Sequence, residues 1–317
     1  MLSHEEMVGL QRESHDLIDG QSFKTKEQYT LHLMHTFAYE CAAALAKDKH
    51  VLDLGCNTGY GSDILSQKAK SVNAVDVSDK AIEKAKSIQG EKSTPSGQNP
   101  IDFQVIDGKT LPFADDSFDV IVSCQVIEHI VDHTLYMGEL KRVLARCGVV
   151  FFTTPNATLR LYPGMKPWNK FHVREYTASE LADFVSGYFP AFEIFGLQAQ
   201  DPLHSIEKNR LTNERENARR RQEAKRRQEA GGSPPKADFS WRKAAKALLP
   251  GVVVDVIRRV LGKELPDKSV SAEWMEKHGT ESFSYEQANL DEALDLMALC
   301  ALEAEPLSGA RELIEKL

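Results

Sequence analysis

The sequence predicts an α/β protein with a doubly wound, mostly parallel sheet. Apolar runs of strand length alternate with segments of helical periodicity between about residues 50 and 200. The first run, at residues 51–54, is followed by glycines at positions 55, 59 and 61 and then by a helical pattern. A strand, a glycine-rich turn and a helix in this order bring backbone N–H groups and a helix N-terminus close to a bound ligand.

The other elements follow in chain order. Helical spacing predicts a helix over residues 27–46, ahead of the first strand. Apolar runs predict the second to sixth strands at residues 71–75, 101–106, 120–124, 148–156 and 192–197. Helical patterns at residues 79–88, 135–144 and 177–187 separate them, and the last of these begins with the capping-box pair Thr177 and Glu180.

The glycine-rich turn differs from a dinucleotide-binding turn. Its spacing is G-x-x-x-G-x-G and not G-x-G-x-x-G. Asp53 lies inside the first strand, where a carboxylate would repel a pyrophosphate but would suit a ligand with an ammonium group. The second strand ends at Asp76, where a carboxylate can accept hydrogen bonds from a ribose diol.

With these residues the stretch resembles the class I S-adenosylmethionine-dependent methyltransferases. The resemblance implies a seven-stranded Rossmann-like sheet, S-adenosylmethionine as the cofactor and methyl transfer as the reaction. It assigns to Asp107, after the third strand, a hydrogen bond from the adenine amino group. The cofactor-binding residues that it implies are Asp53, Gly55, Cys56, Asn57, Gly59, Asp76, Val77, Asp107, Gly108 and Gln125.

The last strand of the sheet is expected near the C-terminus. Residues 289–293 resemble the entry to the last strand in bacterial members of this family, which places that strand at residues 294–302, although periodicity alone also permits a helix there. The chain then divides into an N-terminal helical extension (1–48), a cofactor-binding core (49–200), a charged and basic amphipathic helical insertion (201–287), and the last strand with a C-terminal helix (288–317).

The candidate catalytic residues are His129, His172 and Glu128, which follow the fourth and fifth strands. Methyl transfer to a hydroxyl requires removal of its proton, and a neutral imidazole suits that role. Residues 171–176 look like those of bacterial methyltransferases of glycan and secondary-metabolite pathways. That likeness implies O-methylation of a small-molecule, sugar or glycan-linked hydroxyl.

A metal-dependent site is the alternative. Glu128 and His129 with a later histidine resemble metal-dependent O-methyltransferases, whose fourth strand ends in Glu-x-x-Glu-His. Gln125 replaces the first acid of that pattern, which weakens the charge on a divalent cation. We therefore expect no metal ligands here and keep a divalent metal as the alternative.

The composition and charge of the chain limit the partners and the location that we expect. The formal net charge of −8 argues against a surface coated with nucleic acid. The N-terminus lacks the features of a signal peptide, and no apolar run is long enough to cross a bilayer, so we expect a cytoplasmic protein. The segment 240–265 is basic and amphipathic, so it either contacts an anionic membrane peripherally or packs on the enzyme itself or on a dimer partner. The sequence leaves the oligomeric state open.

Two other functions fit parts of the sequence. One is an NAD-dependent or nucleotide-sugar Rossmann enzyme, which the glycine spacing and Asp53 disfavour. The other is a non-catalytic cofactor-binding or scaffold protein that acts through its charged insertion. Cofactor binding without turnover on any acceptor would favour the scaffold.

Overall fold

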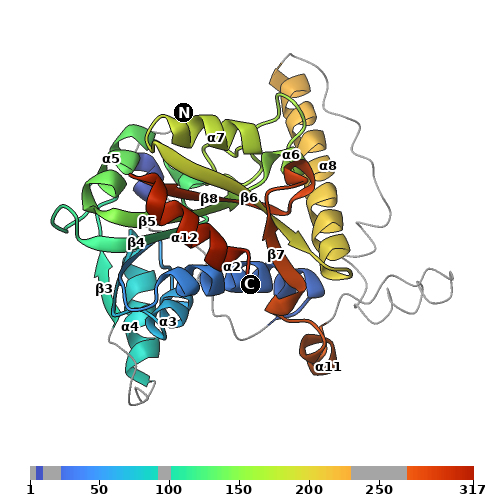
Figure 1. The fold of residues 1–317 in the computed structure, drawn as a ribbon. Coiled ribbons are helices and arrows are strands. Elements are labelled where there is room, and N and C mark those ends of the chain that lie inside the picture. The colour runs from blue at the N-terminus through green and yellow to red at the C-terminus, as the bar shows by residue number, and fades with distance from the viewer. Residues whose placement is uncertain (1–4, 10–22, 92–100, 230–269) are drawn as a thin grey trace.

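The fold is built on one mixed sheet with helices on both faces (Figure 1). The computed structural model describes residues 5–9, 23–91, 101–229 and 270–317, so the segment 240–265 lies outside the described residues. The sheet order is β3-β2-β1-β4-β5-β8-β6-β7. The strands are β1 (His50–Leu54), β2 (Ser71–Asp76), β3 (Ile101–Val105), β4 (Phe118–Cys124), β5 (Leu144–Pro155), β6 (Ala191–Ala199), β7 (Phe283–Glu286) and β8 (Asp295–Ala301).

The sheet has eight strands and not the expected seven. The strand expected at residues 294–302 is present as β8, which lies antiparallel between β5 and β6. The extra strand, β7, pairs antiparallel with β6 at the sheet edge. It comes from the segment that was expected to be a helical insertion, and its four residues are too few to show a clear alternation in the sequence.

Helices cover the two faces of the sheet. The helices are α2 (Lys26–Leu45), α3 (Tyr60–Ser66), α4 (Asp79–Glu91), α5 (His133–Val143), α6 (Ala157–Arg160), α7 (Ala178–Ser186), α8 (Leu203–Glu229), α11 (Ala272–Glu276) and α12 (Ala304–Ile314). Apolar residues of α2, α3, α4, α8 and α12 share one core cluster, whereas α5 and α7 pack on the opposite face. Neighbouring strand residues alternate between these clusters: Val120 and Val122 face the first, and Ile121 faces the second.

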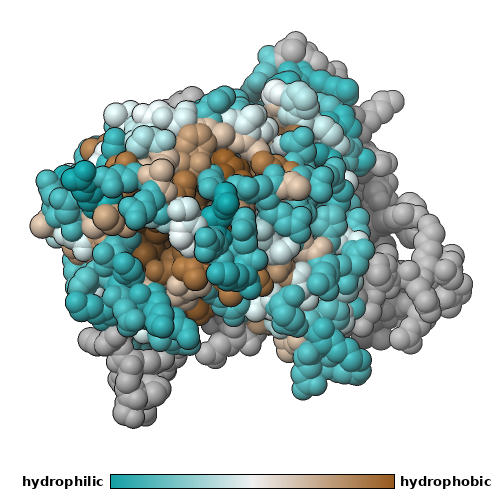
Figure 2. All heavy atoms as spheres, in the orientation of Figure 1, coloured by the Kyte–Doolittle hydropathy of each residue, from teal (hydrophilic) through white to brown (hydrophobic). Residues whose placement is uncertain are grey.

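The long helix α8 borders the carboxyl ends of the strands. It packs against α2 and α6, and its buried side is narrow, with Leu203, Glu207, Leu211 and Ala218. Its exposed residues are mainly charged, and its visible surface in Figure 2 is hydrophilic. Most other residues of α8 are intermediate or exposed.

The carboxyl ends of β1, β2, β4 and β5 lie at one edge of the sheet because these strands are parallel. Since β8 runs the other way, its first residue, Asp295, pairs with Pro155 and lies at the same edge. The parallel strand β3 ends there as well, so this edge gathers the turns after β1 to β5 and the start of β8. Ligands bind at this edge in open α/β sheets.

Candidate active site

The turn after β1 requires glycine at two positions. Gly55 and Gly59 have φ of +85° and +80°, which disfavour other residues. A Cβ on Gly55 would lie 2.4 Å from Val126 Cγ2, and one on Gly59 would lie 2.6 Å from the ring of Phe103. Glycine is therefore required at both positions by the backbone conformation and by close packing against Val126 and Phe103.

Asp76 is fixed at the end of β2 by the backbone of two turns. Its Oδ2 accepts a hydrogen bond from Asn57 N at 2.9 Å, and its Oδ1 accepts one from Ser78 N at 2.8 Å. Each carboxylate oxygen has a second lone pair, so Asp76 can still accept hydrogen bonds from a ribose diol. The carboxylate is only 4% exposed, and it lines a pocket.

The pocket opens at the carboxyl ends of β1, β2 and β4. Of the residues that the sequence assigns to the cofactor, those that line it are Gly55, Asp76, Val77, Gly108 and Gln125. Apolar side chains of Leu54, Ile106, Leu111, Val126 and Ile130 supply much of the remaining wall. A mainly apolar pocket with a few fixed polar groups is the usual form of a cofactor site.

The other expected cofactor residues lie outside this lining: Asp53, Cys56, Asn57, Gly59 and Asp107. Asp53 is fully buried and accepts hydrogen bonds from Tyr39 Oη (3.1 Å) and Ser62 Oγ (2.5 Å), so it ties β1 to α2 and α3. Burial raises its pKa to about 7, against the opposing effect of those two hydrogen bonds.

Asp107 is exposed at the end of β3. Its Oδ1 accepts hydrogen bonds from the backbone N–H groups of Thr110 (3.0 Å) and Lys109 (2.7 Å), and these lower its pKa. The carboxylate therefore organises its own turn. The hydrogen bond from adenine that the resemblance assigns to it stays a prediction.

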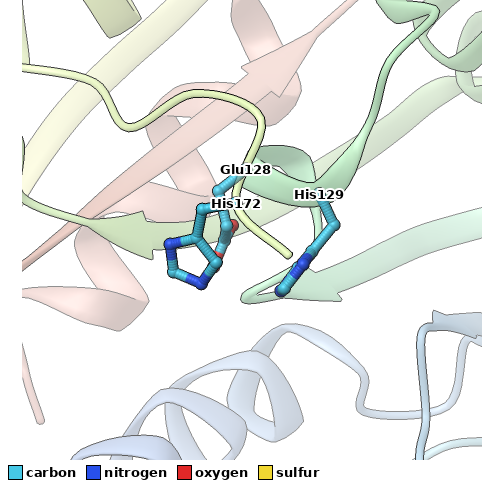
Figure 3. A group of neighbouring side chains, drawn as sticks. All are labelled: Glu128, His129 and His172. Carbon is cyan, nitrogen blue, oxygen red and sulfur yellow. The ribbon is translucent and has the colours of Figure 1, made fainter. Parts of the chain in front are cut away.

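Glu128, His129 and His172 come together (Figure 3). Glu128 and His129 lie in the 3-10 turn η1 (Ile127–His129) after β4, and His172 lies in the loop before α7. The two imidazole centroids are 4.7 Å apart, and one N or O atom from each of the three residues lies within 4.8 Å of the others. His129 also lines the cofactor pocket, so the cluster adjoins that pocket.

Backbone hydrogen bonds hold the two segments together. The carbonyl oxygen of Glu128 accepts from Val173 N at 2.7 Å and from Arg174 N at 3.3 Å. Nδ1 of His129 lies 3.1 Å from the carbonyl oxygen of Phe171, which can only accept. His129 therefore carries its proton on Nδ1 when neutral, and its Nε2 is the basic nitrogen.

Glu128 is a buried carboxyl group. It is 1% exposed and accepts a hydrogen bond from Thr154 Oγ1 at 3.1 Å. Burial raises its pKa, although His172 and the Thr154 hydroxyl oppose this effect. These three side chains could also hold a metal ion, as one carboxylate and two imidazoles. Gln125 is not among them, because its Nε2 donates to Asp295 Oδ2 at 3.1 Å.

Several residues at this edge were not expected from the sequence. Glu175 and Arg160 lie behind His172, and Asp295 lies beside Gln125. The only sequence signal for them is the spacing of three between His172 and Glu175 in one loop. Arg160 and Asp295 reach the site from α6 and from the antiparallel strand β8, so only the folded chain brings them there.

Part of the chain is similar to known proteins. Residues 52–152 match the family model described as "Methyltransferase domain". A Mycobacterium tuberculosis protein named as a probable S-adenosylmethionine-dependent methyltransferase is 33% identical over 152 residues, which are 48% of this chain and 52% of that protein. A Rhizobium etli ubiquinone biosynthesis O-methyltransferase is 30% identical over 110 residues, which are 35% of this chain and 42% of that protein.

Among solved structures, the YcgJ protein of Bacillus subtilis is similar with 17% sequence identity and a TM-score of 0.44, over 85% of this chain and 99% of that one. The chain spans about half the length of the first curated relatives that it matches. The matched residues, 52–152, contain the glycine-rich turn, Asp76 and the Glu128–His129 pair. Over these residues the chain is similar to the methyltransferase domain of S-adenosylmethionine-dependent methyltransferases.

Proposed function

We propose that this protein is a methyltransferase that uses S-adenosylmethionine to methylate a hydroxyl oxygen. The observation that carries the proposal is the cluster of Glu128, His129 and His172 beside the cofactor pocket. The lining residue Gly55 and the fixed Asp76 carboxylate suit the cofactor, which supplies an electrophilic methyl group when bound. The residues of this chain must then orient the acceptor and remove its proton.

The two imidazoles suit proton removal from a hydroxyl. His172 has Nδ1 2.6 Å from the Glu175 carboxylate, and His129 has Nδ1 at the Phe171 carbonyl oxygen. His172 therefore presents Nε2 as the nitrogen that can take a proton. We assign the general base to His172, and we assign hydrogen bonding to the acceptor hydroxyl to His129 and Glu128.

The acceptor that we propose is a small molecule, a sugar or a glycan-linked hydroxyl. The relatives named as ubiquinone biosynthesis O-methyltransferases support the transfer to oxygen. We also propose a cytoplasmic location, with peripheral membrane contact through residues 240–265, which lie outside the described residues. No helix in the described part of the chain has the length and apolar content to span a bilayer.

Cofactor affinity should depend on Asp76. In Asp76→Ala the ribose diol loses a charged hydrogen-bond acceptor, so binding of S-adenosylhomocysteine should weaken by roughly 1.5–3 kcal/mol, which is about 10- to 150-fold in Kd. Isothermal titration calorimetry measures this loss. Asp102→Ala is the matched control, because Asp102 is an exposed residue of β3 that accepts hydrogen bonds from the side-chain amides of Asn73 and Gln104. Equal affinities of Asp76→Ala and the wild type would contradict the role of Asp76.

Turnover should not require magnesium. Mg²⁺ takes mostly oxygen ligands in octahedral geometry, whereas the cluster offers one carboxylate and two imidazoles. We expect equal kcat in EDTA and in added magnesium, measured by the rate of S-adenosylhomocysteine formation. If activity is lost in EDTA, returns with a divalent cation and is lost again in Glu128→Gln, the site is metal-dependent and this expectation is wrong.

The function is tested by label transfer. The full chain is incubated with methyl-labelled S-adenosylmethionine and fractionated small-molecule and glycan extracts, and labelled products are identified by mass spectrometry. The proposal predicts label in an O-methyl group, and label on nitrogen or carbon would contradict O-methylation. Tight cofactor binding with no labelled product in any fraction would favour the scaffold function instead.

A further inference from the structure

A buried carboxylate lies behind His172. Oε1 of Glu175 is 2.6 Å from Nδ1 of His172, and the Glu175 side chain is 0% exposed. A carboxylate that approaches Nδ1 at this distance accepts its proton in a hydrogen bond. The other ring nitrogen, Nε2, is then left on the side of His172 away from Glu175. Figure 3 shows the ring of His172 beside the side chain of Glu128, with the ring of His129 to one side of the pair.

Arg160 keeps this carboxylate in place. Its Nε lies 2.8 Å from Glu175 Oε2 and its Nη2 lies 3.0 Å from Oε1, which is a bidentate pair. The guanidinium also lies over the ring of Trp168, 4.3 Å from its centroid. Burial alone would raise the pKa of Glu175, but the hydrogen bond from His172 and the charge of Arg160 outweigh burial and lower it. Glu175 is therefore ionised at neutral pH.

We propose that Glu175 is a positioning residue, which holds His172 in the tautomer with its proton on Nδ1 and so makes Nε2 the nitrogen that takes the acceptor proton. This inference rests on the proposed function, in which His172 is the general base. In that step the acceptor O–H bond breaks and an N–H bond forms at Nε2, and the electron pair stays on the acceptor oxygen. The positive charge gained by the imidazole faces the ionised Glu175.

The contacts of Glu175 distinguish this role from a purely structural one. An ion pair with Arg160 alone would not require Oε1 to lie at Nδ1 of His172 as well. The loop is already tied to η1 through the carbonyl oxygens of Glu128 and Phe171. Since the loop has these other attachments, the contact between Glu175 and His172 fixes mainly the orientation and tautomer of the ring.

The tautomer can be read directly by nitrogen NMR. The full chain is labelled with ¹⁵N-histidine, and the His172 signals are assigned by their loss in His172→Ala. A protonated and an unprotonated ring nitrogen resonate far apart, so the spectrum identifies which one carries the proton. In the neutral ring, we expect the proton of wild-type His172 on Nδ1 and an unprotonated Nε2. A proton on Nε2 in the wild type would overturn the proposal without the need for any variant.

The variant Glu175→Gln tests whether Glu175 is the group that keeps the proton of His172 on Nδ1. The glutamine amide can present an N–H to Nδ1, so the proton of His172 should move to Nε2. The Nε2 signal should then be that of a protonated nitrogen, and the Nδ1 signal that of an unprotonated one. Glu180→Gln is the matched control, because Glu180 contacts Thr177 and Arg174 in the same segment and not His172. Unchanged His172 signals in Glu175→Gln would overturn the proposal.

Kinetics on the identified acceptor give an independent readout. In Glu175→Gln we expect kcat to fall about 10²-fold, in the range for loss of a general base, with KM and S-adenosylhomocysteine affinity retained. Normal kcat in this variant, with kcat lost in His172→Ala, would also overturn the proposal. Failure of the proposed function is distinguishable, because the wild type would then transfer no label to an acceptor hydroxyl, whatever the tautomer of His172.

Discussion

Replacing His172 with alanine should lower kcat by about 10²–10⁴-fold, the usual effect of losing a general base. The acceptor hydroxyl must lose its proton during methyl transfer, and His172 presents Nε2 next to His129 and Glu128. The affinity for S-adenosylhomocysteine should stay nearly unchanged, because His172 is not among the residues that line the cofactor pocket. The rate is measured on the acceptor found by label transfer, and the affinity by calorimetry.

A matched control separates catalysis from folding. His50→Ala removes an imidazole at the start of β1, at the opposite edge of the sheet, where its Nδ1 lies 2.7 Å from Ser71 Oγ. This variant should keep kcat near the wild-type value. If His172→Ala keeps normal kcat while it remains folded by circular dichroism, His172 is not the base. Normal kcat in His129→Ala as well would leave a site that acts by proximity alone.

Truncating Leu299 in β8 should lower the free energy of unfolding by about 2–5 kcal/mol, as for other buried leucines. Leu299 is 0% exposed and pairs with Phe151 of β5 and Glu193 of β6, so its side chain lies in the middle of the sheet. The cost is a large part of the roughly 5–15 kcal/mol that stabilises a typical protein. Guanidinium denaturation of Leu299→Ala measures it.

Leu313→Ala is the control for this loss. It removes the same atoms from a residue of α12 that is 42% exposed, so its effect should lie within about 0.5 kcal/mol of zero. An unfolding free energy of Leu299→Ala equal to that of Leu313→Ala would contradict the place of β8 between β5 and β6. The comparison therefore tests whether the chain after residue 270 completes the sheet.

The sequence predicted β1 and β4 most directly, because both pair in parallel on each side and are almost entirely buried, which produces mainly apolar runs at residues 51–54 and 120–124. It predicted the last strand only through resemblance, since the apolar run at residues 294–302 fits a buried helix equally well. The short strand β7 was missed because its partner, β6, comes more than eighty residues earlier in the chain.

The site residues were predictable from the sequence where they lie in or close to a predicted strand. Gly55 follows β1, Asp76 ends β2 and His129 lies in the turn after β4. Their position at the carboxyl edge could therefore be inferred from the order of elements. The roles of Glu175 and Arg160 could not, because they depend on hydrogen bonds between α6 and a loop without regular structure. Asp53 was only partly predictable. Its place in the strand was clear, but its hydrogen bonds to Tyr39 and Ser62 appear only in the folded chain.

The central claim is that the pocket after β1 and β2 binds S-adenosylmethionine, and calorimetric titration of the full chain tests it most directly. S-adenosylhomocysteine and NAD are titrated separately, because both contain adenosine but only the first lacks a pyrophosphate. The account predicts saturable binding of one S-adenosylhomocysteine per chain and no heat of binding with NAD. Binding of NAD, or no binding of S-adenosylhomocysteine by the folded protein, would contradict it.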